Sequence, residues 1–353
     1  MRHRAPRGQS GSIPPAPPNA SRPRRHRLRF GSALLAATMF AVACGGGDGD
    51  IGEGAPTVDE ITVDWAYYNP VSLVLKEKGW LEEELDGIEV NWVQSAGSNK
   101  ALEFLAARSI QFGSTAGAAA LLAKINGTAI RSVYAYSQPE WTALVTNAGS
   151  GIDSVDDLVG KKVAVTRGTD PYIFLVRALA DHGLAENDIE AVLLQHADGR
   201  NALIGGSVDA WAGLDPMMAE AELEQGATLF YRAPELNTWG VLNVDETFAA
   251  EHPEIVETVI AAYERGRVWS LENPDELAAI LAGAAGLSEQ VAQRQLERTD
   301  LTTPAIGPLQ RESILGAGIV LQEAGVIEDE VDVGSTLDEL LDESFSAGLE
   351  GGG

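Results

Sequence analysis

The sequence predicts an α/β protein of two lobes followed by a mainly helical stretch. From Glu60 onward, short runs rich in β-branched and aromatic residues alternate with runs of helical length. This alternation is typical of βαβ units and parallel sheets. After Asn243 the alternation stops, and residues 245–345 are nearly all helical in pattern. We therefore expect two α/β blocks, with the helical stretch completing the first of them.

Ten segments have the pattern of strands. They are 61–67, 88–93, 109–113, 130–136, 141–146, 161–165, 189–194, 208–212, 227–231 and 239–244. Ser154 and Asp157 have the spacing of a capping box just before the strand at 161–165. Gly183 is placed to end the helix that precedes it.

The strands 141–146 and 239–244 lie where one block gives way to the next, so we expect them to be hinge strands crossing between the lobes. These two crossings divide the chain into the first part of lobe 1 (58–142), lobe 2 (143–238), the mostly helical second part of lobe 1 (239–345) and a disordered tail (346–353).

The first 43 residues have the pattern of a secretory signal peptide. They contain eight Arg and no acidic residue, and a 14-residue apolar run ends at Ala43. That run is too short to span a bilayer, which needs about 20 residues. The AVAC stretch that ends at Cys44 resembles a lipoprotein lipobox, which implies lipidation of Cys44, and 44–57 is expected to be a flexible tether. We expect an exported protein that is lipid-anchored to the outer face of the cytoplasmic membrane or periplasmic, with Sec or twin-arginine export left open.

Charge and composition exclude several functions. The formal net charge is −27, and without the basic first 43 residues it is −35, so nucleic-acid binding is not expected. His182, His196 and His252 have no metal-ligand spacing, and no nucleophile elbow or phosphate loop occurs. We expect no catalytic residues, no metal, no cofactor and a monomer.

One local pattern occurs three times: a strand ends, a Gly with Ser or Thr follows, and a helix then begins. The three stretches are QSAGSNKALEF (94–104), FGSTAGAAALL (112–122) and TRGTDPYIFLV (166–176). Ligands of parallel α/β sheets bind at the carboxyl ends of strands, and a helix N-terminus offers unpaired N–H groups to an anion. The candidate ligand residues at these seams are Gly97, Ser98, Ser114, Thr115, Gly168 and Thr169. The alternative for each seam is an ordinary helix N-cap.

Aromatic side chains near strand ends are further candidates. Tyr67, Tyr68 and Asn69 follow the first strand and could wall the pocket. Trp211 and Trp239 could pack on an apolar tail of a ligand. Core packing is the alternative for these aromatics.

Three charged residues complete the candidate site. Arg167 is the Arg best placed at a strand end to meet an anion, although a long side chain beside a loop is also expected to be exposed. Asp170 and Asp215 could receive an amine if the ligand is a zwitterion, and helix capping is the alternative for Asp170.

The sequence as a whole resembles the substrate-binding proteins of bacterial ABC importers for aliphatic sulfonates, taurine and nitrate. The superfamily of these proteins also includes binders of thiamine pyrimidine precursors. The likeness covers residues 58–330 and is nearest to the aliphatic-sulfonate branch. The segments that carry it are ALEFLAARSIQFGSTAGAA, SVDDLVGKKVAVTRGTDPYIFLVRALADHGL, GGSVDAWAGLDPMMAEAEL and HPEIVETVIAAYERGRVWSLENPDELAAILA.

The resemblance implies a type II periplasmic-binding-protein fold: two Rossmann-like lobes, two hinge strands and an interlobe cleft that delivers a small organic anion to a membrane permease. It places Gly113-Ser114-Thr115, Gly168-Thr169, Trp211 and Asp215 on cleft motifs. An aliphatic sulfonate is the expected ligand, with nitrate, taurine or a pyrimidine precursor as alternatives. A pyrimidine-synthesis enzyme on the same fold is the further alternative, for which His196 is the candidate reactive residue.

This sequence departs from the family pattern at three places near the cleft. Ala116-Gly117 stands where the family often has Gly-Asp, and Asp170-Pro171-Tyr172 where it has Ser-Ala-His. Leu214 replaces the Trp that commonly precedes Asp-Pro.

Overall fold

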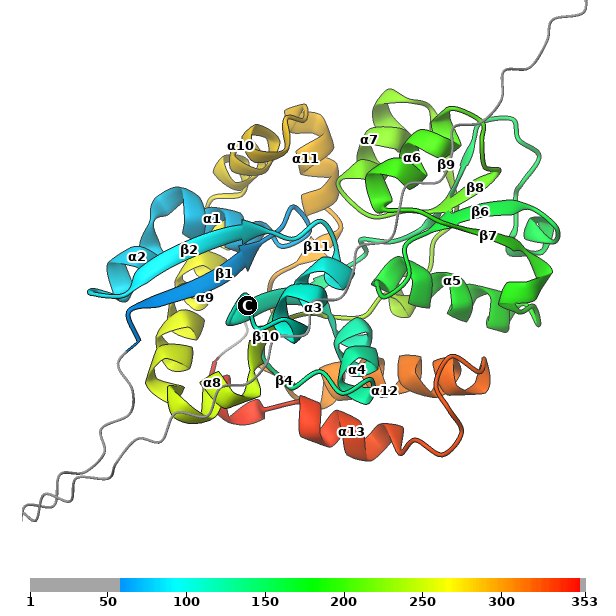
Figure 1. The fold of residues 1–353 in the computed structure, drawn as a ribbon. Coiled ribbons are helices and arrows are strands. Elements are labelled where there is room, and N and C mark those ends of the chain that lie inside the picture. Colours follow the sequence, from blue (N-terminus) through cyan, green and yellow to red (C-terminus); the bar gives the residue numbers. More distant parts are fainter. Residues whose placement is uncertain (1–57, 350–353) are drawn as a thin grey trace, which may run out of the picture. The chain divides into compact units, whose positions relative to one another are not determined.

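The structure, a computed structural model, describes residues 58–349 and contains two β-sheets with helices packed on them (Figure 1). The first sheet has the strand order β11 (Thr299–Asp300), β4 (Ile130–Pro139), β10 (Gly240–Asp245), β3 (Phe112–Ala116), β1 (Glu60–Trp65) and β2 (Glu89–Gln94). The second sheet has the order β7 (Glu190–Leu193), β6 (Lys162–Val165), β8 (Ala210–Ala212), β5 (Leu144–Asn147) and β9 (Ala227–Tyr231).

The helices divide between the two sheets. The first sheet has α1 (Pro70–Lys78), α2 (Trp80–Glu84), α3 (Ser98–Ala106), α4 (Gly117–Ile125), α8 (Glu246–Glu251), α9 (Pro253–Glu272), α10 (Pro274–Ala285), α11 (Glu289–Leu296), α12 (Pro308–Glu323) and α13 (Val333–Leu340). The second sheet has α5 (Asp170–Asp181), α6 (His196–Ile204) and α7 (Met217–Glu224). We call the first set with its sheet lobe 1 and the second set with its sheet lobe 2. The described chain also forms short 3-10 turns at Val155–Leu158, Glu186–Asp188, Pro234–Leu236 and Glu343–Phe345.

The two sheets share one plan. Each has three neighbouring parallel strands, β2-β1-β3 in lobe 1 and β7-β6-β8 in lobe 2. Next to these lies an antiparallel strand, β10 in lobe 1 and β5 in lobe 2. Each antiparallel strand directly follows a segment that crosses from the other lobe, residues 140–143 before β5 and 232–239 before β10. This arrangement is the two-lobed, two-crossing α/β architecture that the sequence predicts.

All ten predicted strands are present, and the largest shift is at β3. The predicted strand 109–113 lies at Phe112–Ala116, because residues before it still close helix α3: Ala107 caps the helix and Arg108 has a left-handed φ of 52°. Ser114 and Thr115 are therefore strand residues, and α4 begins at Gly117. The prediction that these hydroxyls occupy a strand–helix seam is wrong. The two-residue strand β11 was not predicted.

Both local helix signals are confirmed. The Asp157 carboxylate accepts hydrogen bonds from the backbone N–H and the hydroxyl of Ser154, at 2.9 Å each, which forms the expected capping box. Gly183 directly follows His182, the residue that caps the end of α5, and has a φ of 70°; the next N–H, of Leu184, bonds back to Leu179 O at 2.8 Å. A glycine at this left-handed position ends a helix without steric cost.

The carboxyl end of β1 carries a buried polar network. Asp64 Oδ1 accepts hydrogen bonds from the backbone N–H and the hydroxyl of Ser114, both at 2.8 Å. Asn69 donates to Ser114 Oγ at 2.8 Å and also caps α1, while Tyr68 donates to Ser114 O at 2.9 Å. Burial raises the pKa of Asp64 to about 7, although its hydrogen bonds act in the opposite direction. The network fixes the register between β1, β3 and the start of α1.

A second buried carboxylate ties the two crossing segments together. Asp170, the first residue of α5, accepts from Trp141 Nε1 at 2.8 Å and from the N–H and hydroxyl of Thr238 at 2.9 and 2.6 Å. The Asn237 amide also joins the two segments, because its Oδ1 accepts from Thr142 N at 2.9 Å. Both crossing segments are therefore hydrogen-bonded to the N-terminus of one lobe 2 helix, α5.

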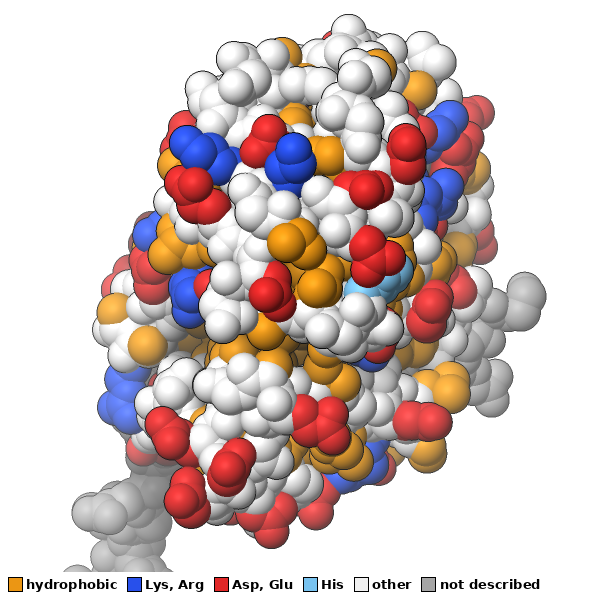
Figure 2. Space-filling view, turned by 90° about the vertical axis from the view of Figure 1, so that its right-hand side faces the viewer, with side chains coloured by type: hydrophobic (Ala, Val, Ile, Leu, Met, Phe, Trp, Pro, Cys, Tyr) orange, Lys and Arg blue, Asp and Glu red, His pale blue; other side chains and the backbone are white. Residues whose placement is uncertain are grey.

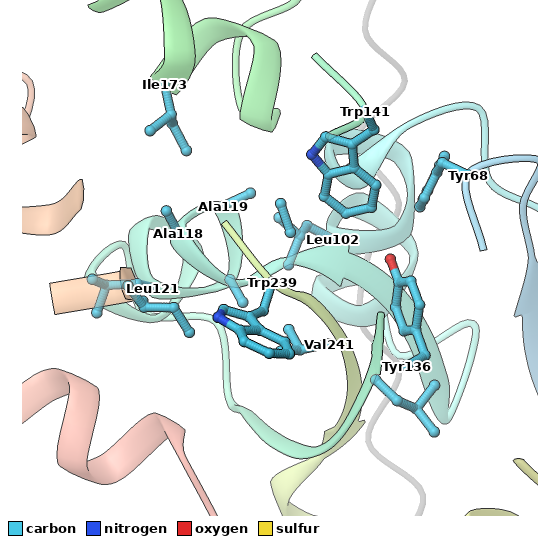
Figure 3. Close-up of a cluster of buried hydrophobic side chains, with 14 of the residues drawn as sticks. Tyr68, Leu102, Ala118, Ala119, Leu121, Tyr136, Trp141, Ile173, Trp239 and Val241 are labelled. Atoms are coloured by element: carbon cyan, nitrogen blue, oxygen red, sulfur yellow. The ribbon is translucent and has the colours of Figure 1, made fainter. Parts of the chain in front are cut away.

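Apolar packing surrounds this tie. Figure 3 shows Trp141 and Trp239, which come from the two crossing segments, in one group of side chains with Ile173 of α5 and Tyr68. Tyr68 and Trp141 meet edge to face with ring centroids 5.8 Å apart. The crossing segments are therefore part of the continuous core that joins the lobes.

The predicted signal segment (1–43), Cys44, the tether (44–57) and residues 350–353 lie outside the described residues. Ser346, predicted to begin a disordered tail, is buried, and its hydroxyl accepts from Ile306 N at 3.1 Å. Across residues 58–349, none of the helices combines the length and apolar character needed to cross a bilayer.

The buried Asp64 predicts a specific pH dependence of stability. Between its ordinary pKa of 3.8 and its folded value of about 7, the native state keeps a proton that the unfolded state has lost. Stability therefore falls as pH rises through this window. In Asp64→Asn, this fall in the free energy of unfolding should be reduced by at most about 4 kcal/mol between pH 4 and pH 7. Urea denaturation across this range measures it.

Asp86→Asn, an exposed substitution of the same kind, is the control and should leave the pH profile of the wild type unchanged. Parallel pH profiles for Asp64→Asn and the wild type would contradict the assignment.

Candidate functional site

A pocket of about 440 Å³ lies between the lobes. It is lined by Tyr67, Gln94, Ala96, Gln195, His196, Ala197, Arg200, Pro216, Met217, Glu220, Ala285, Gly286 and Leu287. Tyr67 and Gln94 lie at the carboxyl ends of β1 and β2, and Gln195 and Pro216 follow β7 and β8. Two parallel strands of each sheet thus end at this pocket, and the carboxyl ends of such strands are where ligands bind.

His196 opens helix α6 on the lobe 2 wall and has a defined tautomer. The Thr166 hydroxyl donates its single hydrogen to Leu194 O at 2.7 Å and lies 3.3 Å from His196 Nδ1. It can therefore only accept from Nδ1–H, which leaves the lone pair on Nε2. Burial lowers the pKa of His196 to about 3, so the ring is neutral at physiological pH. Nε2 is buried and has no hydrogen-bond partner among residues 58–349.

Arg200 lies one turn further along α6. It pairs with Glu220 of α7 across the lobe 2 wall. Its Nε–H is buried and finds no hydrogen-bond partner in the described part of the chain. The α6 N-terminus, which is capped by none of the described side chains, adds a partial positive charge beside it. Together these groups give the pocket unused donor capacity for an anion.

Gly199 explains how α6 comes to lie so close to the sheet. A Cβ at this position would be 2.9 Å from Cδ1 and Nε1 of the Trp211 ring on β8. A side chain larger than hydrogen would push the helix away from the strand. Trp211 is therefore fully buried under α6, in the core of lobe 2.

The lobe 1 wall touches lobe 2 at Gly97. A Cβ on Gly97 would be 2.8 Å from His196 Nε2 and 2.9 Å from Asn99 Oδ1. Only glycine permits this approach of α3 to α6. On the same wall, Tyr67 is held by two bonds: its hydroxyl donates to Ala284 O at 3.2 Å, and its carbonyl accepts from Gln295 Nε2 at 2.7 Å.

Charged pairs join α11 and Arg298, which follows it in lobe 1, to α7 and Asp215, which precedes it in lobe 2. Arg294 pairs with Glu222 at 3.2 Å, and Arg298 pairs with both Asp215 at 3.3 Å and Glu222. Ser288 Oγ donates to Glu224 at 2.7 Å. Burial raises the pKa of Asp215 to about 6, while the positive charge of Arg298 acts against this rise. These contacts hold the lobes together in the conformation of this structure.

Of the thirteen predicted ligand residues, Tyr67 lines the pocket. Gly97 contacts His196 at the seam between the lobes, and Gly168, with φ of 73°, approaches Asn99 there. Several others are buried and bonded within the protein; they are Tyr68, Asn69, Ser98, Ser114, Thr115, Thr169 and Asp170. Their hydroxyl, amide and carboxylate groups serve strand register, helix starts and the tie between the crossing segments.

The remaining three predicted residues also have internal partners. Arg167 is half exposed, pairs with Glu186 and lies over the Tyr172 ring at 5.0 Å. Trp211 is in the lobe 2 core, and Asp215 binds Arg298 and the N–H of Ala219. The cation that lines the pocket is Arg200, which is not among the predicted ligand residues.

The missed lining residues follow strands whose loops lack a Gly-Ser or Gly-Thr signal. Gln195, His196 and Arg200 come just after the strand predicted at 189–194, and Glu220 comes after 208–212. Applying the carboxyl-end rule to every parallel strand, and not only to the glycine-containing seams, would have found them.

Other hollows in the described residues lie away from the strand ends of lobe 2. One of about 550 Å³ has walls of mixed charged and apolar residues, including Asp59, Arg108 and Phe248. A smaller one of about 190 Å³ lies between α5 and α12. Figure 2 shows a face on which apolar side chains gather in a band, with acidic side chains above and below it.

The close contact between Gly97 and His196 can be tested with alanine substitutions at two glycines. We expect these substitutions to change the free energy of unfolding in opposite directions. Gly97→Ala places a methyl group 2.8 Å from His196 Nε2, and we expect it to lower the free energy of unfolding by about 1–3 kcal/mol. Gly283→Ala in α10 is the control. Its Cβ would meet no atom of residues 58–349 within 4 Å, so the substitution should raise stability by up to about 1 kcal/mol. Guanidinium denaturation measures both, and an unchanged or raised stability in Gly97→Ala would contradict the packing described.

Comparison with known proteins agrees with this architecture. A protein of Bacillus subtilis named for aliphatic-sulfonate binding is 29% identical over 279 residues, 77% of this chain and 83% of that protein. Its counterpart in Escherichia coli is 27% identical over 283 residues, 80% and 85% of the two chains. The alkanesulfonate-binding protein SsuA of Xanthomonas axonopodis pv. citri, solved with MOPS bound, superposes with a TM-score of 0.74 at 22% identity, over 80% of this chain and 99% of that one.

The family model described as NMT1/THI5 like matches residues 70–277, which contain both crossing segments and most of the pocket lining. This span exceeds half of the chain, and it includes the carboxyl ends of β2, β7 and β8, which lead into the pocket. The protein therefore belongs to the NMT1/THI5-like family.

Proposed function

We propose that this protein is the extracytoplasmic solute receptor of an ABC importer and that it binds a short aliphatic sulfonate in the interlobe pocket. The observation that carries the proposal is the Arg200 side chain on the wall of that pocket, whose Nε–H has no hydrogen-bond partner among residues 58–349. The two relatives named for aliphatic sulfonates support it, because the match covers more than four-fifths of each of them.

The chemistry of the pocket suits an anion with an apolar tail. A sulfonate remains ionised and needs fixed donors, which Arg200 and the α6 N-terminus supply. Tyr67, Met217 and Leu287 provide apolar surface for the carbon chain. The negative charge of the whole protein does not prevent binding, because screening over about 8 Å at physiological salt leaves the local donors to decide.

Binding is coupled to lobe closure. A ligand that touches α6 of lobe 2 and Tyr67 of lobe 1 favours the closed conformation by its extra contacts there. The ion pairs of Arg294 and Arg298 with Glu222 and Asp215 join residues of different lobes, so they add to the stability of the closed state. The closed receptor is the form that a membrane permease would accept. Export with anchoring through Cys44, or release to the periplasm, places the receptor where that permease is.

Substitutions at Arg200 and Glu220 test the anion site, because they should change the affinity for alkanesulfonates in opposite directions. Arg200→Gln removes the charged donor and should weaken alkanesulfonate binding about tenfold or more. Glu220→Gln releases Arg200 from its carboxylate partner and should strengthen binding. Calorimetry with ethanesulfonate and butanesulfonate measures both.

Arg167→Gln is the control, because Arg167 pairs with Glu186 away from the pocket, and it should bind as the wild type does. A thermal-shift series with sulfonates, taurine, nitrate and pyrimidines tests the ligand class. Wild-type affinity in Arg200→Gln would reject the anion site, and stabilisation only by nitrate or a pyrimidine would reject the sulfonate.

A further inference from the structure

Two helices, one from each lobe, are attached to the same crossing segment. The backbone N–H of Asp215, which lies just before α7 of lobe 2, donates to Trp141 O at 2.9 Å. The carbonyl of Arg298, which lies just after α11 of lobe 1, accepts from the N–H of Glu140 at 2.7 Å. Both partners belong to the crossing segment 140–143. One end of each helix is therefore fixed at the hinge between the lobes.

Two contacts between these helices lie further from the hinge. Arg294 binds Glu222 at 3.2 Å, one turn of α11 away from the attached end. The Ser288 hydroxyl donates to Glu224 at 2.7 Å at the opposite end of α11. With a rise of about 1.5 Å per residue, Ser288 lies about 15 Å along the helix from Arg298. We call the Arg294–Glu222 and Ser288–Glu224 contacts the α7–α11 clasp.

The outer end of the clasp leads directly into the pocket. Residues 285–287, which immediately precede Ser288, line the pocket from lobe 1. Met217 and Glu220 of α7 line it from lobe 2. The four clasp residues are not part of this lining. The clasp therefore affects how closely two walls of the pocket approach each other, although its own side chains do not touch a ligand there.

The charges of the clasp are arranged so that it can open. Arg294 is also 3.1 Å from Glu297 of its own lobe, and Glu222 is also bound by Arg298. Separation of Arg294 from Glu222 thus leaves neither charge without a partner, which is the main cost of breaking an ion pair. The side chains of Arg298 and Asp215 are only 4% and 1% exposed, so breaking their pair would leave a buried charge unpaired. We expect that innermost pair to persist as the pivot.

We propose that the α7–α11 clasp sets the balance between the open and the closed receptor, and that Arg294 and Glu222 are positioning residues that raise ligand affinity without contacting the ligand. This inference rests on the proposed function of the pocket. Rotation about the crossing segments moves atoms in proportion to their distance from these segments, so the clasp separates more than the innermost pair does. The apparent affinity of a receptor falls with the fraction of molecules in the binding conformation, so a contact between the lobes contributes to it.

Arg294→Gln tests the clasp in calorimetry with butanesulfonate. The side chains of Arg294 and Glu222 are 35% and 25% exposed, so water screens their attraction, and we expect binding to weaken about two- to fivefold. Arg294→Glu places a like charge beside Glu222 and Glu297 and should weaken binding further, whereas Arg294→Lys should retain much of the wild-type affinity. Arg311→Gln is the matched control, because Arg311 is 36% exposed and pairs with Asp338 within lobe 1. It should bind as the wild type does.

Salt distinguishes an electrostatic clasp from a structural effect of the substitution. In about 1 M NaCl the Debye length falls to about 3 Å, so the wild type and Arg294→Gln should bind butanesulfonate with similar affinity there. In about 0.01 M salt their affinities should differ most. An affinity difference that does not change with salt would overturn the inference. Equal affinities at low salt, or an equal loss in Arg311→Gln, would also overturn it.

A measurement without ligand tests the clasp independently of the proposed function. Spin labels at Asp198→Cys of α6 and Asp275→Cys of α10, both exposed, report the distance between the lobes by double electron–electron resonance in a Cys44→Ser background. In Arg294→Gln the population at longer distance should grow, and in Arg311→Gln it should not. Identical distance distributions for the wild type and Arg294→Gln would overturn the inference. If the wild type binds no sulfonate, the proposed function fails, and this comparison still decides the role of the clasp.

Discussion

The carboxylate of Asp170 joins three parts of the chain that must stay together for a pocket to exist between the lobes. It begins helix α5 in lobe 2, binds the indole of Trp141 on one crossing segment and binds Thr238 on the other. A buried carboxylate is costly unless donors surround it, and here three donors and a helix N-terminus do so. Any movement of one lobe relative to the other therefore pivots about a point where both connections are held.

The pocket inherits its position from this arrangement. Because both crossing segments lead into antiparallel strands, the parallel strands of each sheet end on the side that faces the other lobe. The loops after β1, β2, β7 and β8 then meet across the cleft. Lobe 1 contributes mainly apolar surface, and its backbone at Gly97 lies close to α6. Lobe 2 contributes the charged and hydrogen-bonding groups on α6 and α7. A ligand is recognised chiefly by lobe 2 and enclosed by lobe 1.

The fold was predictable from the sequence to a greater extent than the site. Strands such as β6 and β9 are marked by local hydrophobic pattern, and patterns of this kind survive tertiary contacts. The role of a polar side chain does not have this local origin. Ser114 looks like a ligand donor in sequence, but Asp64, fifty residues earlier, takes its hydrogen bond. Conversely, His196 has no distinctive neighbours in sequence, and only Thr166 and Gly97 give its Nε2 a defined state and place.

The discontinuous lobe 1 also has a consequence for how the chain reaches its native state. Strand β10 lies between β4 and β3, so the first sheet lacks an interior strand until residue 245 has been synthesised. Lobe 2, by contrast, is one uninterrupted segment whose strands are complete at Tyr231. During vectorial synthesis or translocation, lobe 2 can fold before lobe 1 is complete. The crossing segment 232–239 then leads strand β10 back to the part of lobe 1 that was synthesised earlier. The nascent first lobe has open strand edges during that interval, so slow emergence of the chain would expose it to chaperones and to aggregation.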